Sequence, residues 1–237
     1  MNSKILILGA SSDIGVELIK ILLKDQIEIF AHCNKHSKKI KNLSKEKNIK
    51  IIKKNFYNIS EKKFNIFLKN NLNFNFSKVV NLIGYIDRKN YNNTNLNSLS
   101  ESIKINAIFP MFTIRHAVKK MLKKGYGRIV NCSSIGIKYG GGINSFNYSY
   151  SKHASEFIPQ IYKNWAKKNV LINNLRIGLC NTKINNFRTP KEMKKRIGLI
   201  PVKRISTPKE IANYIYFFLS DKNSFITNEN ISISGGE

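Results

Sequence analysis

Short apolar runs alternate with helical patterns along this chain of 237 residues, and the alternation limits the folds available to it. The segment Lys4–Leu8 is apolar after its first residue and is followed by glycine, as expected of a strand buried on both faces of a parallel sheet. Ile14–Leu23 then has apolar residues at helical spacing. Repeated strand–helix units predict a doubly wound parallel sheet of about seven strands with helices on both faces. Further strands are expected at Ile27–Cys33, Ile49–Lys53, Val79–Ile83, Arg128–Cys132, Val170–Ile177 and Ile231–Ile233.

Two longer helical patterns occupy the middle of the chain. Leu96–Leu122 contains Pro110, and Tyr148–Lys168 is a second strong pattern. The Asn-rich stretch Asn90–Asn97 follows the strand predicted at Val79–Ile83 and leads into the first of these helices. It is expected to be a surface loop. No linker, repeat or low-complexity tail is present, so one domain over residues 1–237 is predicted. No apolar run approaches the roughly 20 residues of a membrane helix, and the N-terminus resembles a strand rather than a signal peptide.

The formal net charge of +27 is the most unusual bulk property. Such a balance often indicates nucleic acid or another acidic partner. However, Lys, Asn and Ile are heavily used throughout, while Gly, Ala and Arg are scarce, a pattern typical of an AT-rich genome. We therefore expect no nucleic-acid partner and no membrane contact, although selection for an acidic protein partner stays open.

The three cysteines indicate in which redox compartment the protein works and whether it holds a disulfide or a metal site. Cys33, Cys132 and Cys180 are widely spaced, and no CxxC or Cys/His cluster accompanies them. Disulfides and metal sites are therefore not expected, and a reducing, cytoplasmic location is predicted. Each cysteine stands among apolar residues and is interpreted as a small core residue.

A glycine-containing turn joins the first strand to the first helix. Gly9 permits a tight turn, and the N-terminus of the helix offers free N–H groups to a pyrophosphate. Gly15 allows the helix to pack close to the strand. Asp13 stands where nucleotide-binding turns usually have their middle glycine, so its carboxylate should point away from the phosphates, for instance to cap the helix. An ordinary turn with a Ser or Asp cap is the alternative. The candidate cofactor residues here are Gly9, Ser11, Ser12, Asp13, Ile14 and Gly15.

A tyrosine and a lysine four residues apart suggest acid–base chemistry. Tyr148 and Lys152 would share one face of a helix, whereas Tyr150 would point elsewhere. The lysine charge should lower the pKa of the tyrosine. Upstream, a strand ends at Ser134, and the glycines of 140–142 lead back to the helix, which can bring a serine hydroxyl to the tyrosine.

These motifs together resemble the short-chain dehydrogenases/reductases, over essentially the whole chain. The stretches that carry the resemblance are Gly9–Gly15, Gly127–Ser134, Tyr148–Lys152, Pro201–Ala212 and Ile226–Gly236, in the family's order and spacing. The resemblance implies a single-domain Rossmann fold with a short substrate loop at about 185–200. It also implies an oxidoreductase that transfers a hydride between a nicotinamide cofactor and a carbonyl or alcohol substrate.

The resemblance assigns roles by position. Tyr148 matches the general acid, and Lys152 matches the residue that lowers its pKa and holds the nicotinamide ribose. Ser134 matches the residue that binds the substrate oxygen, and Asn106 matches a proton relay through water. Further cofactor contacts are implied at Asn55, Asn81, Gly84, Ile177, Gly178 and Thr182. The chain departs from the family pattern at Leu82 and Ile83, at Asn55 in place of aspartate, and at Ile177 in place of proline.

The segment after the second strand bears on the choice between NADP and NAD. NAD selectivity needs an acidic residue there, but no Asp or Glu lies between Glu28 and Glu46. Asn34 and Lys35 are able to hold the 2′-phosphate of NADP instead. NADP is therefore predicted, with NAD less favoured and a solvated basic helix start as the alternative.

The substrate is less constrained. The nearest subfamily is that of 3-oxoacyl-(acyl-carrier-protein) reductases, which predicts a small or carrier-linked carbonyl substrate. A reductase of sugar or nucleotide-sugar intermediates for surface polysaccharide is the first alternative, and a non-catalytic NADP-binding or nucleic-acid-binding protein is the second. The family also implies a homo-oligomer, a dimer or tetramer, paired through the helices of Asn106 and Tyr148. The expected docking residues for an acidic carrier are Lys123, Lys124, Arg128 and Lys168.

Overall fold

The seven predicted strands form one parallel sheet in the order β3-β2-β1-β4-β5-β6-β7. The structure, a computed structural model, describes residues 3–35, 38–44, 48–185 and 188–237. The strands are β1 Lys4–Leu8, β2 Glu28–Cys33, β3 Ile49–Lys53, β4 Lys78–Asn81, β5 Gly127–Ser134, β6 Val170–Ile177 and β7 Asn230–Ile233. Because β1 pairs with both β2 and β4, the strand order reverses there and opens a crevice beyond the carboxyl ends of the strands.

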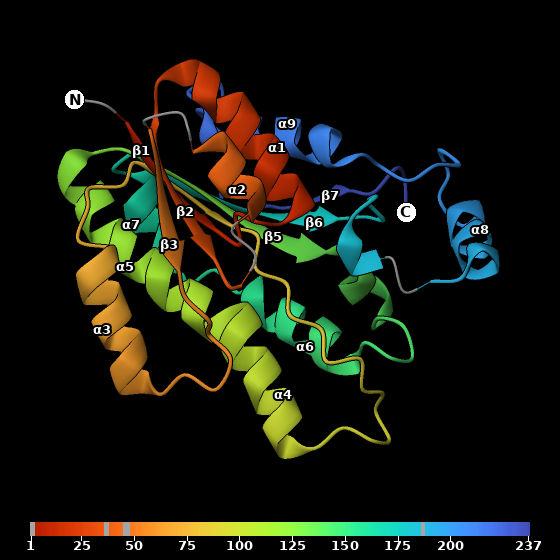
Figure 1. Cartoon of the computed structure of the whole chain (residues 1–237). Coiled ribbons are helices and arrows are strands. Elements are labelled where there is room, and N and C mark those ends of the chain that lie inside the picture. Colours follow the sequence, from red (N-terminus) through yellow and green to blue (C-terminus); the bar gives the residue numbers. More distant parts are fainter. Residues whose placement is uncertain (1–2, 36–37, 45–47, 186–187) are drawn as a thin grey trace.

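Helices cover both faces of the sheet (Figure 1). One face carries α1 Asp13–Leu22, α2 Lys38–Leu43 and α9 Pro208–Leu219, and the other carries α3 Glu61–Asn71, α4 Leu96–Ile103, α5 Phe109–Lys124, α6 Phe146–Ser155 and α7 Tyr162–Ala166. The short helix α8 Pro190–Gly198 stands apart at the edge of the molecule.

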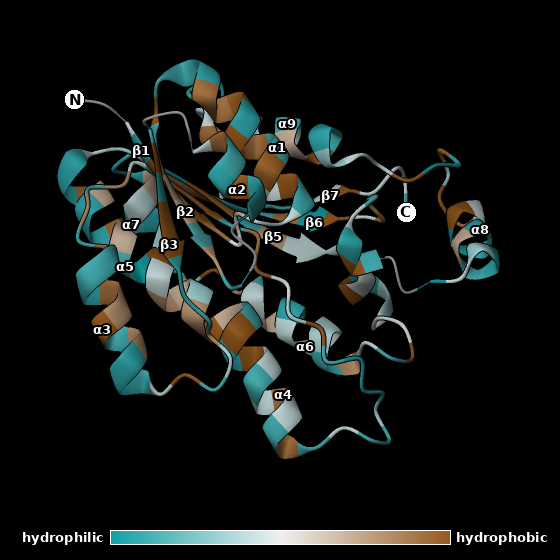
Figure 2. Cartoon of the chain, in the orientation of Figure 1, coloured by the Kyte–Doolittle hydropathy of each residue, from teal (hydrophilic) through white to brown (hydrophobic). Residues whose placement is uncertain are grey.

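The alternation of side chains along β1 explains the two layers. Ile5 and Ile7 belong to the core under α1 and α9, whereas Leu6 and Leu8 pack with α3 and α5. All four side chains are fully buried. The strands are accordingly the most apolar part of the chain, while the outer faces of the helices are hydrophilic (Figure 2).

The helix predicted at Leu96–Leu122 is confirmed, with one irregularity. A π turn, Lys104–Ile108, separates α4 from α5. Pro110 follows it in the first turn of α5. Within a regular helix the proline ring would clash with the carbonyl of Asn106, four residues earlier, and the wider π turn relieves that conflict.

The continuous helix predicted at Tyr148–Lys168 is wrong. It is divided into α6, which ends at Ser155, and α7, which begins at Tyr162. Pro159 lies in the break, where its missing N–H and its ring would interrupt a continuous helix. In the sheet, β4 ends at Asn81, two residues earlier than predicted, because the Asn81 side chain accepts a hydrogen bond from the Ile83 N–H and begins a turn.

Two smaller expectations concern the core and the membrane. Cys33, Cys132 and Cys180 are free thiols and buried, which confirms their interpretation as core residues. Within the described ranges, no helix has both the length and the apolar composition needed to cross a membrane.

Candidate active site

A cleft of about 1640 Å³ lies at the carboxyl ends of the central strands. It brings together most of the residues singled out in the sequence, although they come from segments spread over the whole chain. Those that line it are Gly9, Ser11, Ser12, Asp13, Ile14, Asn34, Lys35, Asn55, Gly84, Ser134, Tyr148, Lys152, Ile177, Gly178 and Thr182. Gly15, Asn81 and Asn106 lie behind the wall of the cleft and do not line it.

The turn after β1, called the phosphate turn below, has the shape of a phosphate cradle. Gly9 has φ +76°, and a Cβ there would lie 2.8 Å from the carbonyl carbon of Leu82. The Ser12 side chain caps α1 by accepting a hydrogen bond from the Gly15 N–H at 3.1 Å. A Cβ on Gly15 would lie 2.5 Å from the Ala10 carbonyl oxygen, so glycine is needed for the close approach of helix and turn.

Asp13 does not cap the helix, because Ser12 does so. Its carboxylate pairs with the Lys39 ammonium at 2.5 Å and accepts a hydrogen bond from the Lys183 backbone N–H at 2.9 Å. Burial alone would raise the pKa of Asp13, but the hydrogen bonds and charges of Lys39 and Lys183 outweigh it and hold the pKa below its usual value. Asp13 thus joins the phosphate turn to α2 and to the segment after β6.

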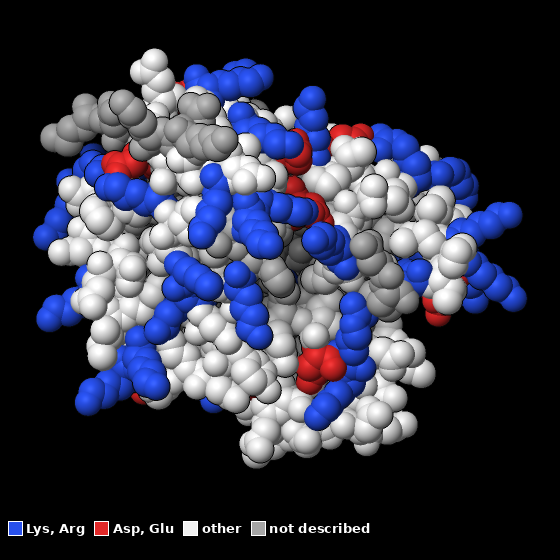
Figure 3. All heavy atoms as spheres, in the orientation of Figure 1, with Lys and Arg blue, Asp and Glu red and all other residues white. Residues whose placement is uncertain are grey.

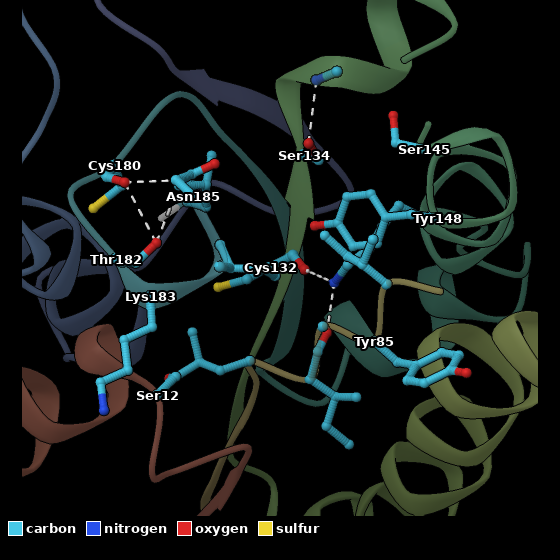
Figure 4. A pocket seen from close by; sticks show the side chains of 18 of the residues that line it. Ser12, Tyr85, Cys132, Ser134, Ser145, Tyr148, Cys180, Thr182, Lys183 and Asn185 are labelled. Atoms are coloured by element: carbon cyan, nitrogen blue, oxygen red, sulfur yellow. Dashed lines mark hydrogen bonds between the residues drawn. The ribbon is translucent and has the colours of Figure 1, made fainter. Parts of the chain in front are cut away.

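Tyr148 and Ser134 meet on the other side of the cleft. In Figure 4 the hydroxyl of Tyr148, from α6, points toward the end of β5, where Ser134 lies. Burial raises the pKa of Tyr148 to about 12, and a hydrogen bond with Ser134 acts in the opposite direction. Tyr148 is therefore protonated near neutral pH and able to donate its proton.

The Lys152 ammonium group lies 6.0 Å from the centre of the Tyr148 ring, and its expected effect on the pKa of Tyr148 stays a prediction. The Lys152 ammonium group donates to the backbone carbonyls of Ile83 and Cys132, at 2.7 Å each (Figure 4). Burial lowers the pKa of Lys152 to about 8 because the charged form loses hydration. The spacing placed both residues on one side of α6, but it carried no information about these carbonyl acceptors.

Asn106 lies in the π turn and is fully buried. Its side-chain amide donates to the Tyr85 carbonyl and to the Ser151 hydroxyl, and its oxygen accepts from the Tyr85 N–H, each at 2.8 Å. The side chain thus ties the segment after β4 to α6. The relay role implied for Asn106 stays a prediction.

A ladder of asparagines lies behind α6. Asn81, Asn131, Asn174 and Asn230 stand in register on β4, β5, β6 and β7, and their side-chain amides are linked by hydrogen bonds of 2.8 Å. Asn131 also donates to the Ser155 carbonyl, and Asn174 donates to the Glu156 carbonyl, both at the end of α6. The ladder therefore holds the helix that carries Tyr148, and Asn81 donates to Asn131 within it. The cofactor contact predicted for Asn81 stays a prediction.

Comparison with known proteins decides the family. A family model described as enoyl-(acyl carrier protein) reductase matches residues 68–237. The chain belongs to the short-chain dehydrogenase/reductase family of oxidoreductases. This confirms the resemblance seen in its motifs.

Individual relatives agree with this membership. A 3-oxoacyl-[acyl-carrier-protein] reductase of Buchnera aphidicola is 34% identical over 157 residues, which is 66% of this chain and 61% of the relative. The corresponding reductase of Aquifex aeolicus is 29% identical over 73% of each chain. A solved 3-oxoacyl (acyl-carrier-protein) reductase of Agrobacterium tumefaciens, with NADP bound, matches with a TM-score of 0.85 at 19% identity, covering 99% of this chain and 94% of that one. At that identity the structural likeness shows the fold.

His32 is a residue of this dehydrogenase cleft that the sequence did not reveal. It lies in β2 beside the last residue of that strand, stacks on Phe56 with ring centroids 4.6 Å apart and is 3% exposed. One ring nitrogen lies 3.4 Å from the Gly9 N–H and the other 3.0 Å from the Lys54 carbonyl. Burial lowers its pKa to about 4, so the ring is neutral and accepts from Gly9 while donating to Lys54.

The predicted carrier-docking residues do not lie at the cleft. Arg128 is 3% exposed and holds the carbonyls of Gly127, Asn169 and Asn223, so it is a structural residue. Lys123 and Lys124 end α5, and Lys168 precedes β6. All four therefore lie near the amino ends of parallel strands, whereas the cleft of this dehydrogenase/reductase lies at their carboxyl ends. The prediction that these residues dock a carrier beside the active site is therefore wrong.

Cations that do line the cleft were missed because lysine is common everywhere in this sequence. Lysine and arginine side chains surround a hollow in the face shown in Figure 3. In addition to Lys35 and Lys152, the cleft is lined by Lys38, Lys39, Lys54, Arg88, Lys138, Lys183, Arg188 and Arg196. Their segments are distant in sequence, so only the fold brings them together.

Proposed function

We propose that this chain is an NADP-dependent reductase that transfers a hydride between NADPH and a carbonyl or alcohol substrate. The proposal rests on one observation. Tyr148 and Ser134 are hydrogen-bonded to each other in the cleft, and the phosphate turn lines the same cleft. A proton donor and a hydroxyl directed to one region provide what a carbonyl oxygen needs as it becomes an alcohol.

We assign the following roles in the reaction to these residues. The Ser134 hydroxyl would bind and orient the substrate oxygen. Tyr148 would deliver the proton, since its pKa of about 12 keeps the phenol protonated until charge develops on the substrate oxygen. Lys152, which now holds the Ile83 and Cys132 carbonyls, would bind the nicotinamide ribose and stabilise the phenolate through its charge.

The cleft has the donors that NADP requires. The bound nicotinamide would supply the hydride. The free N–H groups at the start of α1 suit the diphosphate. Asn34, Lys35 and Lys39 line the part of the cleft beside α2, where a 2′-phosphate would be held. Among the described residues of the β2–α2 segment, 28–35 and 38–43, the only carboxylate is Glu28, which pairs with Lys4 and Lys50 at the opposite end of β2.

For the substrate, we propose a small or carrier-linked 3-oxoacyl compound. The names of the relatives in Buchnera aphidicola and Aquifex aeolicus support this choice. We place the reaction in the cytoplasm, because all three cysteines are free and buried, as suits a reducing compartment.

The experiment compares two tyrosines on the same helix. NADPH consumption is followed with a carrier-linked 3-oxoacyl substrate and with a sugar ketone. Tyr148→Phe should lower kcat by about 10²-fold or more while nearly preserving NADPH binding. Tyr150→Phe is the matched control, because Tyr150 is 53% exposed and does not line the cleft. Equal loss in both variants, or little loss in Tyr148→Phe, would refute the proposed acid. Turnover of the sugar ketone alone would replace the acyl substrate with a carbohydrate.

A further inference from the structure

The segment between β4 and α4 forms one wall of the cleft, although it is neither helix nor strand. It comprises residues 82–95, called the wall segment below, and it runs beside α6 before it enters α4 (Figure 1). Its residues that line the cleft are Leu82, Ile83, Gly84, Tyr85, Ile86 and Arg88. Because such a segment lacks the hydrogen-bond ladder of a helix or a sheet, its contacts with neighbouring elements must hold it in place.

Three side chains from α6 and the π turn hold the wall segment. Lys152 donates to the Ile83 carbonyl at 2.7 Å, and Asn106 binds both the N–H and the carbonyl of Tyr85. Asn147, in the first turn of α6, is the third. Lys152 lines the cleft and would turn to the cofactor in the proposed reaction, whereas Asn147 does not line the cleft and keeps its partners throughout.

The Asn147 side chain is fully buried and binds two partners in the wall segment. Its amide nitrogen donates to Asp87 Oδ2 at 2.7 Å, and its oxygen accepts from the Thr94 hydroxyl at 2.7 Å. Asp87 Oδ1 in turn accepts from the Lys89 N–H at 3.1 Å. Thr94 directly precedes Asn95, which caps α4. Asn147 therefore joins the start of α6, the wall segment and the start of α4.

The two partners require an amide at position 147. A carboxylate only accepts hydrogen bonds, so the group that faces Asp87 must donate, while the group that faces the Thr94 hydroxyl accepts. A carboxylate in place of the amide would repel Asp87, and an apolar side chain would leave both partners unpaired. Asparagine is common throughout this chain, so its presence alone has no meaning. Complete burial with both ends of the amide paired does.

From these contacts we propose that Asn147 is a positioning residue of the reductase. Through Asp87 and Thr94 it holds the wall segment against the first turn of α6, and it thereby fixes this wall of the cleft relative to Tyr148, the next residue of the helix. The inference rests on the proposed reductase function, because a displaced wall is detected as lost turnover. A misplacement of about 1 Å caused by a residue outside the chemistry can cost about 10²-fold in rate.

The test replaces the amide with a carboxylate and uses pH to restore the hydrogen bond. In Asn147→Asp two carboxylates face each other, and one shared proton rebuilds the bond between them. Burial and the neighbouring charge hold that proton to an unusually high pH, so the bond should be present at about pH 6 and lost by about pH 9. With NADPH and acetoacetyl coenzyme A, kcat should be close to native at the lower pH. Relative to native, it should fall about tenfold or more by the higher pH.

Two further variants separate this effect from general damage. In the double variant Asn147→Asp, Asp87→Asn the donor and the acceptor exchange places, which should restore the native pH profile. Asn164→Asp adds the same charge on α7, where Asn164 is exposed and does not line the cleft, and it should leave kcat unchanged at each pH.

The other titratable groups around the pair do not imitate this response. Arg88 and Lys89 follow Asp87 in the wall segment and stay charged throughout the pH range. Burial, and to a smaller degree Tyr57 and the charges of Asp87 and of Glu101 in α4, raise the pKa of Tyr85 above its usual 10. Its phenol therefore stays protonated in every protein compared.

A second measurement reads the wall segment without turnover. Limited proteolysis with trypsin at about pH 8.5 is followed by mass spectrometry, with the bond after Lys163 of α7 as the internal reference. Cleavage after Arg88 or Lys89 should be severalfold faster in Asn147→Asp than in the native protein, and it should return to the native rate in the double variant. If Asn147→Asp does not fold, Thr94→Val, which removes one of the two bonds of Asn147, should still lower kcat severalfold.

The two measurements distinguish failure of this inference from failure of the proposed function. Faster cleavage that the double variant reverses, in a protein without carbonyl turnover, would refute the reductase and leave Asn147 as a support of the cleft wall. Native turnover with parallel pH profiles in the native protein and Asn147→Asp would overturn the positioning role alone. A loss at every pH that the double variant does not restore, or an unchanged kcat in Thr94→Val, would overturn it as well.

Discussion

The Asp13 carboxylate accepts a hydrogen bond from the Lys183 backbone N–H at 2.9 Å, across 170 positions of sequence. It thereby connects the two ends of the proposed cofactor site, the phosphate turn and the segment after β6. The same carboxylate neutralises Lys39, a cation that lines the cleft. A negative charge at this place is unexpected beside a diphosphate, and its effect on the cofactor can be measured.

We predict that Asp13→Asn tightens NADPH binding. The amide oxygen retains an acceptor for the Lys183 N–H, while Lys39 loses its counter-charge and becomes available to the cofactor phosphates. The gain should be roughly three- to tenfold in Kd, the scale of a partly screened charge, and it should shrink at high salt. Fluorescence titration checks it. Glu17→Gln is the matched control, because Glu17 pairs with Lys20 on the same helix at 2.6 Å but lies outside the cleft. Weaker binding in Asp13→Asn would instead make Asp13 an organiser of the turn.

A second prediction concerns the choice of cofactor. NADPH should bind more tightly than NADH, and Lys35→Asp should shift the preference toward NADH by removing a cation and adding repulsion to the 2′-phosphate. Lys35 is exposed and lines the cleft. Lys53→Asp is a suitable control, since Lys53 is exposed at the end of β3 and does not line the cleft. Equal affinities of the native protein for NADPH and NADH would contradict the NADP proposal.

The sequence predicted the sheet well and the catalytic interior only in part. The central strands are buried on both faces and have clear apolar runs, and the partly exposed edge strands β3 and β7 still carry several isoleucines, so all seven strands were found. The break at Pro159 was overlooked because apolar residues continue at helical spacing on both sides of it. The acceptors of Lys152 and the asparagine ladder depend on the register between strands, which no local pattern encodes. The cations that line the cleft escaped notice because they come from distant segments, as Arg88 and Arg188 do, 100 positions apart.

A third prediction concerns self-association. Ile108, Phe157 and Ile161 are exposed by 38%, 73% and 54% on or beside the helices that carry Asn106 and Tyr148. Large apolar side chains this exposed are commonly covered by a partner, so these helices should pair two copies of the chain. Light scattering at micromolar concentration should show a dimer or tetramer, and Phe157→Glu should halve its mass. Phe225, 95% exposed before β7, provides the comparison. Dissociation by Phe225→Glu but not by Phe157→Glu would place the interface at Phe225. A stable monomer of the native protein would exclude an interface at either residue.

The last prediction concerns His32 and pH. Its ring is buried and neutral, with a pKa lowered from 6.5 to about 4, chiefly by burial. Between these two values the unfolded chain binds a proton that the folded chain does not, so stability falls as pH falls through this window. The full loss, reached well below pH 4, is roughly 3 kcal/mol, because a tenfold difference in proton affinity is worth about 1.4 kcal/mol. His32→Gln keeps an acceptor for the Gly9 N–H and a donor for the Lys54 carbonyl but cannot titrate. Urea unfolding of both proteins should therefore show the stability of the native protein falling more steeply between about pH 6.5 and pH 4.5. Carboxylates titrate equally in the two proteins and cancel in the comparison. If the stabilities of the two proteins changed in parallel with pH, His32 would be hydrated or charged in the folded protein. The neutral His32 ring would then not connect β2 to the phosphate turn.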